Sequence, residues 1–156
     1  MKLDWKRLLL CLAIPLGVGG LAALLTGGGM GEYSNFIKPP YSPPGWLFPV
    51  VWTILYLLMG YASYRVWTAD ADRVKIRRAL TLYFAQLAVN FLWPLVFFGA
   101  KWYLAAFFVL LVLWVLVFLC IYAFADVEER AGDLLLPYIL WITFAAYLNV
   151  GVYLLN

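Results

Sequence analysis

The stretch KPPYSPPGWLFPVVWTILYLLMG, residues 38–60, passes from a proline-rich loop into a long apolar run. Four prolines in its first seven residues fix φ near about −65° and remove backbone donors, so the loop is stiff and extended. A helix is expected to open at Pro44 or at the glycine after it, because a missing N–H costs nothing in the first helical turn. Trp52 and Tyr56 then recur at helical spacing on one face. A stiff loop over residues 28–44 that leads into an aromatic helical face predicts a lid over a pocket.

The composition is that of a membrane protein. Hydrophobic residues make up 67% of the chain and charged residues 12%, whereas soluble domains carry about 25% charged residues. A run of about 20 apolar residues crosses the hydrocarbon core of a bilayer. Five such runs occupy most of the chain, so we expect one all-α integral membrane domain over residues 1–156, built as a bundle of five transmembrane helices. The predicted helices cover residues 8–26, 46–67, 79–98, 102–124 and 134–155.

Basic residues are concentrated at one end of the predicted bundle. With five spans, the N-terminus and the loops near residues 68–78 and 125–133 share one side, which holds nine of the eleven lysines and arginines. The opposite side holds Lys38 and Lys101. The positive-inside rule therefore places the N-terminus in the cytoplasm and the C-terminus outside. The net charge of +3 follows from this topology and does not indicate nucleic-acid binding.

The third predicted helix carries a single polar and aromatic stripe, formed by Gln86, Asn90, Trp93 and Phe97 at helical spacing. An amide side chain in hydrocarbon requires a partner, so this stripe is expected to face protein or a ligand. Periodicity leaves both alternatives open: an interhelical hydrogen bond or a ligand contact. Pro94 is expected to break the helix near its outer end.

The fifth predicted helix places Trp141, Ala145 and Asn149 on one face at intervals of four residues. A tryptophan on the same face as a small alanine presents a flat aromatic ring with open space beside it. Tryptophans often lie in the interfacial belts of membrane proteins, but Trp141 and Trp52 lie deeper inside their spans. The fourth predicted helix lacks strongly polar side chains, so we expect it to be the most lipid-exposed span or a dimer face.

Ionisable side chains are missing from the middle of every predicted span. All eight carboxylates lie in termini or loops, and the chain has no histidine. No metal site, nucleophile–base set or proton path can be assembled, which disfavours hydrolytic catalysis and coupled transport. Cys11 and Cys120 both lie in apolar runs and are expected to be free, buried thiols. The remaining possibility is an aromatic cavity suited to a flat hydrophobic ligand.

Three blocks of the sequence resemble signature blocks of the TspO/MBR family: residues 38–60, QLAVNFLWPLVFF at 86–98, and PYILWITFAAYLN at 137–149. This family includes the tryptophan-rich sensory proteins of bacteria and the mitochondrial translocator protein, also called the peripheral benzodiazepine receptor. The resemblance implies a five-helix bundle, usually a homodimer. Bacterial members occur in different membranes, and the apolar helices of this chain fit insertion into the bacterial cell membrane most simply. The resemblance also implies binding of porphyrins such as protoporphyrin IX, of sterols and of drug-like ligands, with no cofactor required.

Matched by position, the pocket of the family corresponds to Tyr33, Trp52, Asn90, Trp141 and Ala145. Spacing had already selected the faces that carry all of these except Tyr33. In some members, the tryptophans that match Trp52 and Trp141 are linked to light- and oxygen-dependent breakdown of protoporphyrin. Both tryptophans are present in this chain, so the resemblance is consistent with the same activity here.

The sequence departs from the family pattern at two positions. Tyr41 stands where many members have a tryptophan in the loop, which is expected to alter the lid. Mammalian members end in a cholesterol-associated motif that requires an arginine or lysine after a tyrosine. Tyr153 is followed by Leu-Leu-Asn, so we do not expect sterol binding through that motif.

Three functions are consistent with these residues. The first is a membrane receptor that binds protoporphyrin IX or another tetrapyrrole in a sensory or homeostatic role. The second is a light- and oxygen-dependent enzyme that degrades protoporphyrin through Trp52 and Trp141. The third is a transporter of porphyrins or lipids, for which the chain shows no source of energy.

Overall fold

The computed structural model describes residues 2–27 and 29–156, so Gly28 of the predicted lid lies outside the described residues. Over these residues the elements are α1 (Trp5–Leu25), α2 (Met30–Asn35), α3 (Leu47–Trp67), α4 (Arg73–Pro94), the π-helical turn η1 (Leu95–Gly99), α5 (Tyr103–Val127), α6 (Glu129–Asp133) and α7 (Leu136–Leu155).

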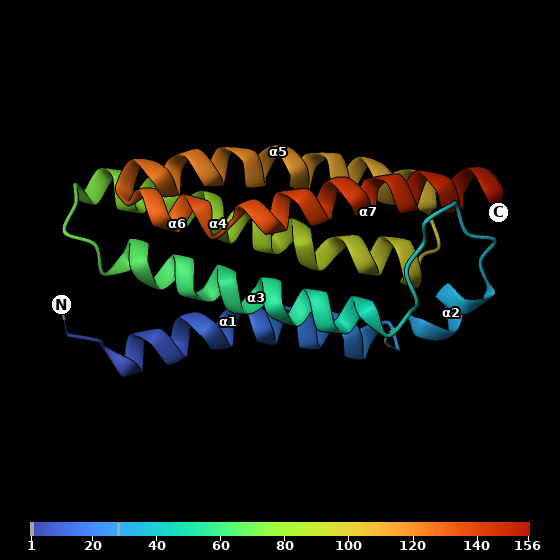
Figure 1. The fold of residues 1–156 in the computed structure, drawn as a ribbon, viewed down its shortest axis with the longest axis horizontal. Coiled ribbons are helices and arrows are strands. Elements are labelled where there is room, and N and C mark those ends of the chain that lie inside the picture. The colour runs from blue at the N-terminus through green and yellow to red at the C-terminus, as the bar shows by residue number, and fades with distance from the viewer. Residues whose placement is uncertain (1, 28) are drawn as a thin grey trace.

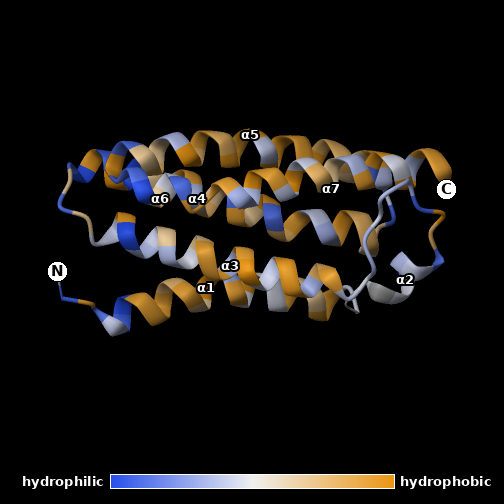
Figure 2. Cartoon of the chain, in the orientation of Figure 1, coloured by the Kyte–Doolittle hydropathy of each residue, from blue (hydrophilic) through white to orange (hydrophobic). Residues whose placement is uncertain are grey.

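The fold is a bundle of long helices, as predicted. In the described part of the chain, five helical segments are long and apolar enough to cross a membrane. Figure 1 shows α1 and α3 side by side on one side of the bundle, with α4, α5 and α7 on the other. Hydrophilic residues gather at the end of the bundle that carries the N-terminus and the α3–α4 turn (Figure 2). Backbone groups in lipid must be paired within the chain, which is why apolar runs of this length fold as helices.

The helix α4 begins earlier than predicted. It starts at Arg73 instead of residue 79, because the Asp72 side chain caps it by accepting a hydrogen bond from the backbone N–H of Val74 at 3.1 Å. The predicted boundary counted apolar residues alone. The first turns of α4 are basic, and they extend the helix beyond the apolar run.

The α-helix ends at Pro94, as expected, but the chain stays helical beyond it. The helix α4 includes Pro94 and continues directly into the wide turn η1. The Ala100 N–H donates to the Leu95 carbonyl five residues earlier, at 2.9 Å. A π-helical turn is a common way for a membrane helix to restore backbone hydrogen bonds around a proline.

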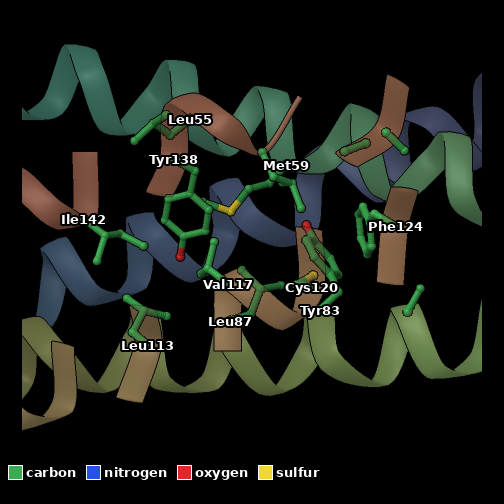
Figure 3. Packing of buried hydrophobic residues seen from close by; sticks show 14 of the residues in the cluster. Leu55, Met59, Tyr83, Leu87, Leu113, Val117, Cys120, Phe124, Tyr138 and Ile142 are labelled. Carbon is green, nitrogen blue, oxygen red and sulfur yellow. The ribbon is translucent and has the colours of Figure 1, made fainter. Parts of the chain in front are cut away.

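Of the two alternatives for the fourth span, the first, that it is the most lipid-exposed span, is not what the structure shows, while the second, that it is a dimer face, stays a prediction. A smaller share of the apolar window is buried in α1 than in α5, 22% against 28%. The helix α5 packs on both α4 and α7. Figure 3 shows Val117 and Cys120 of α5 among Leu87, Tyr83 and Tyr138 in the buried core. Lipid-facing and protein-facing surfaces are equally apolar, so composition could not distinguish them.

The two cysteines are free and buried, as predicted. The backbone of α1 lies close to α3 at one of them. A Cβ placed on Gly60 would lie 2.6 Å from the Cys11 carbonyl oxygen, so this approach requires glycine. The contact brings α1 against α3, and both helices contribute to the wall of the cavity described next.

Candidate functional site

A cavity of about 440 Å³ lies between α1, α3, α4 and α7, near the end of the bundle that carries α2. Its volume is within the range of about 300–1,000 Å³ typical of small-molecule sites. All five site residues predicted from the sequence line it. They are Tyr33 from α2, Trp52 from α3, Asn90 from α4, and Trp141 and Ala145 from α7. The fold therefore brings these residues together, while their role in binding stays a prediction.

One wall of the cavity is built around Trp52. Its ring stacks on Tyr56, one turn further along α3, with centroids 5.6 Å apart, and meets the edge of Tyr138 at 6.2 Å. The Tyr56 ring lies directly against α1, where a Cβ on Gly19 would come within 2.2 Å of it. The glycine therefore provides the space that Tyr56 occupies, and Tyr56 in turn supports the plane of Trp52.

A second wall is built around Trp141. Its ring meets the edge of Phe48 at 5.7 Å, and Phe48 meets Tyr33 at 4.8 Å. Among the described residues, the buried indole N–H of Trp141 has no hydrogen-bond partner. Ala145 follows Trp141 by one helical turn and lines the same cavity. The small side chain leaves the adjoining part of the cavity open.

The amide stripe of α4 forms hydrogen bonds between helices. The Tyr56 hydroxyl donates to Asn90 Oδ1 at 2.9 Å, and Asn90 Nδ2 donates to the Tyr138 hydroxyl oxygen at 2.7 Å. The Tyr138 hydroxyl donates to Gln86 Oε1 at 2.6 Å. Of the two alternatives left open by periodicity, the structure shows the interhelical hydrogen bond. Asn90 still lines the cavity, but its side chain also fixes the two tyrosines that contact Trp52.

A second amide joins three helices in the wall of the same cavity. Asn149 of α7 accepts a hydrogen bond from Trp93 Nε1 at 3.0 Å and donates one to the Tyr103 carbonyl at 2.8 Å. Asn149 is 1% exposed, so both bonds form away from water. These bonds fix α4 and α5 against the helix that carries Trp141.

Sequence reasoning did not name Phe48, Tyr56 or Tyr138 as site residues. It did place Tyr56 on the same helix face as Trp52, because the two residues lie four apart. Whether Tyr138 reaches the site depends on how α7 is rotated toward α4, and no local sequence pattern gives that rotation. Phe48 lies in the first turn of α3, where the sequence suggested only a helix start.

The loop between α2 and α3, residues 36–46, is here called the strap. It runs across the end of the bundle to the C-terminal end of α7 and back to α3 (Figure 1). The side chain of Asn156 accepts from the Ile37 N–H at 3.1 Å and donates to the Ile37 carbonyl at 2.9 Å. The Tyr147 hydroxyl donates to the Pro40 carbonyl at 2.6 Å. Two side chains at the end of α7 therefore bind the strap backbone.

The strap is also in close van der Waals contact with α7. A Cβ on Gly151 would lie 2.5 Å from Pro39, so the ring packs against a helix position that has no side chain. Tyr41, the departure from the family pattern, has a positive φ of 68° and is 91% exposed. Its side chain points away from the cavity, so it forms no part of the cavity wall.

Tyr33 links the strap to the cavity. Its ring lines the cavity, and its hydroxyl donates to the Pro43 carbonyl of the strap at 2.5 Å. Burial raises the pKa of Tyr33 above its ordinary value of 10.0. The hydroxyl therefore stays protonated at neutral pH and can donate this bond.

Comparison with known proteins gives the family. The profile of the TspO/MBR family matches residues 11–155. The chain is 37% identical over 150 residues to the tryptophan-rich protein TspO of Chlorobaculum tepidum, covering 96% of this chain and 95% of that protein. It is 39% identical over 156 residues to a tryptophan-rich sensory protein of Cereibacter sphaeroides, covering 100% and 95%. It is 36% identical over 143 residues to the human translocator protein, covering 91% and 85%.

The match extends over all five membrane-spanning segments and every wall of the cavity. Together with the apolar helices, it identifies an integral membrane protein. The chain belongs to the TspO/MBR family.

Proposed function

We propose that this protein is a membrane receptor for flat hydrophobic ligands, with protoporphyrin IX or a related tetrapyrrole as the ligand and a sensory or homeostatic role. The observation that carries the proposal is the cavity of about 440 Å³ with Trp52 and Trp141 in its wall. Among the described residues, no charged side chain lines it. Relatives named as sensory and translocator proteins support a ligand-binding role in a membrane.

Binding would rest on aromatic contact and burial. Apolar surface removed from water contributes roughly 25 cal/mol per Å², and each well-placed aromatic pair adds about 0.5–1.5 kcal/mol. The hydrogen bonds among Tyr56, Asn90 and Tyr138 fix the surroundings of Trp52 before a ligand arrives. This preorganisation lowers the entropic cost of binding. The unpaired indole N–H of Trp141 supplies a donor for an acceptor on the ligand, after a small rotation of the ring.

The test is a titration of the purified protein with protoporphyrin IX in detergent, in the dark, followed by tryptophan fluorescence quenching. We expect saturable binding at one site. Trp141→Phe should weaken it about three- to tenfold, because an aromatic contact and the indole donor are both lost. Trp102→Phe is the matched control, since Trp102 is 67% exposed and lies outside the cavity lining. If quenching never saturates, or if both variants change it equally, the porphyrin only partitions into apolar surface, and the proposal is rejected.

A second candidate is light- and oxygen-dependent breakdown of the bound porphyrin. It is favoured by the position of Trp52 and Trp141 on one cavity, where both indoles would meet the same ligand. We expect the wild type to lose porphyrin absorbance under light, and Trp141→Phe at saturating ligand to keep it. Loss at equal rates in both would reject it.

We also propose that the N-terminus lies in the cytoplasm of a bacterial cell and the C-terminus outside, with the protein a homodimer. The hydrophilic end of the bundle in Figure 2 and the nine basic residues on that side support the orientation. Cysteines introduced at Asp70 and Lys101 lie at opposite ends of the bundle. An impermeant maleimide should label only the second in intact cells, since Cys11 and Cys120 are buried. The mass of the protein–detergent complex tests the dimer.

A further inference from the structure

A second cavity, of about 580 Å³, adjoins the first at the end of the bundle. Tyr33 lines both cavities. The second is bounded by the end of α2 and the strap, and its lining includes Lys38, Ser42 and Trp46. Unlike the apolar cavity, it therefore carries a charged side chain.

In the described part of the chain, no acidic side chain pairs with Lys38. Its Nζ lies 3.5 Å from the Ser34 carbonyl and 3.4 Å from the Phe36 carbonyl, which are long contacts to neutral groups. Among the described residues, no carboxylate lies within 4.0 Å of it. The other lysine at this end, Lys101, forms an ion pair with Glu32 at 3.1 Å. Hydrogen bonding to Glu32 raises the pKa of Lys101, as expected for a paired ammonium group.

The position of Lys38 is fixed by its surroundings. The ammonium group lies 5.0 Å from the centre of the Tyr33 ring, a cation–π contact with the side chain that lines both cavities. The residue is only partly exposed. A cation held at the boundary of an apolar cavity favours an anion there, because an ionised group is strongly disfavoured inside the cavity itself.

We propose that the second cavity binds an anionic oxygen group, a carboxylate or a phosphate, through Lys38. This inference rests on the proposed function and specifies the ligand further: an amphiphile whose apolar ring body occupies the first cavity and whose acid group reaches Lys38 beside Tyr33. The same chemistry could come from an anionic lipid headgroup at the membrane surface, so the experiment separates the two sources.

The test compares protoporphyrin IX, which carries carboxylates, with its dimethyl ester, which has none, in nonionic detergent in the dark. The wild type should bind the acid about two- to fivefold more tightly than the ester, as expected for a partly exposed ion pair. Lys38→Gln should remove this preference while leaving ester binding unchanged, because glutamine keeps an N–H donor for the Ser34 and Phe36 carbonyls. Lys101→Gln is the matched control and should keep the preference.

The outcomes separate this proposal from the function on which it rests. If neither compound binds saturably, the receptor function itself fails. If the wild type binds acid and ester equally, or if Lys38→Gln keeps the preference, the anion site is wrong and the receptor function stands. In a further arm, phosphatidylglycerol is added to the wild type. Loss of the acid preference, with ester binding unchanged, assigns the site to a lipid phosphate, and an unchanged preference assigns it to the acid group of the ligand.

Discussion

Removing one hydroxyl group from Tyr138 should destabilise the whole bundle. In Tyr138→Phe, the Asn90 amide loses the acceptor it contacts at 2.7 Å, and Gln86 Oε1 loses the donor it contacts at 2.6 Å. Both amides are almost fully buried, at 4% and 1% exposure, so water cannot replace the hydroxyl. A hydrogen bond between membrane helices contributes about 0.6 kcal/mol on average, and the loss of two gives about 1.2 kcal/mol.

The same substitution leaves the shape of the core unchanged. Phenylalanine keeps the ring that packs beside Trp52 and Met59, so no cavity forms and the cost is confined to the two hydrogen bonds. For a chain of this length, about 1.2 kcal/mol corresponds to a fall in Tm of roughly 2–5 °C. Thermal unfolding in detergent, followed by intrinsic fluorescence, measures the change.

The control is Tyr122→Phe, because Tyr122 is 65% exposed on α5 and its hydroxyl has no hydrogen-bond partner among the described residues. It should leave Tm unchanged. A Tm for Tyr138→Phe equal to that of the control would refute the reasoning, since it would mean that the buried network contributes nothing to stability. A fall of more than about 10 °C would also contradict it, by showing that packing is lost as well.

Further substitutions test the cavity wall and the strap. Gly19→Ala should displace the Tyr56 ring, which lies 2.2 Å from the new Cβ, and weaken porphyrin binding in the dark titration. Gly17→Ala, which has nothing within 4 Å of the new Cβ and lies outside the cavity lining, should not. Equal affinities for the two variants would show that this contact does not shape the site. Asn156→Ala should remove both hydrogen bonds to Ile37 and speed ligand release about fivefold in stopped-flow measurements, with a smaller effect for Asn156→Asp, which keeps the acceptor. A release rate unchanged in both would argue against the strap as a lid.

The number and type of the membrane-spanning segments could be predicted because lipid leaves the backbone few choices. An apolar run of sufficient length must form a helix, whatever its neighbours are. Local spacing also predicted which faces carry the site, since residues four apart on a helix share a face. Trp52, Asn90, Trp141 and Ala145 were found in this way, and all four line the cavity.

Contacts between elements could not be predicted in the same way. The amide of Asn90 required a partner, but nothing local indicated that two tyrosines from α3 and α7 would supply it. The sequence could not tell whether lipid or protein covers α5, because an apolar helix looks the same in both cases. Pro94 was read from its missing N–H alone, which did not indicate the wide helical turn η1 that follows it.

The sequence by itself therefore determined the five membrane-spanning helices and the faces that carry polar and aromatic side chains. These follow from hydrogen bonding and periodicity within one helix. Only the tertiary structure decided how the helices are rotated and which side chains meet. It pairs Lys101 with Glu32 and leaves the charge of Lys38 available at the mouth of the site. The reason is physical: a partner is set by distances between helices that are far apart in the chain, and no local interaction encodes those distances.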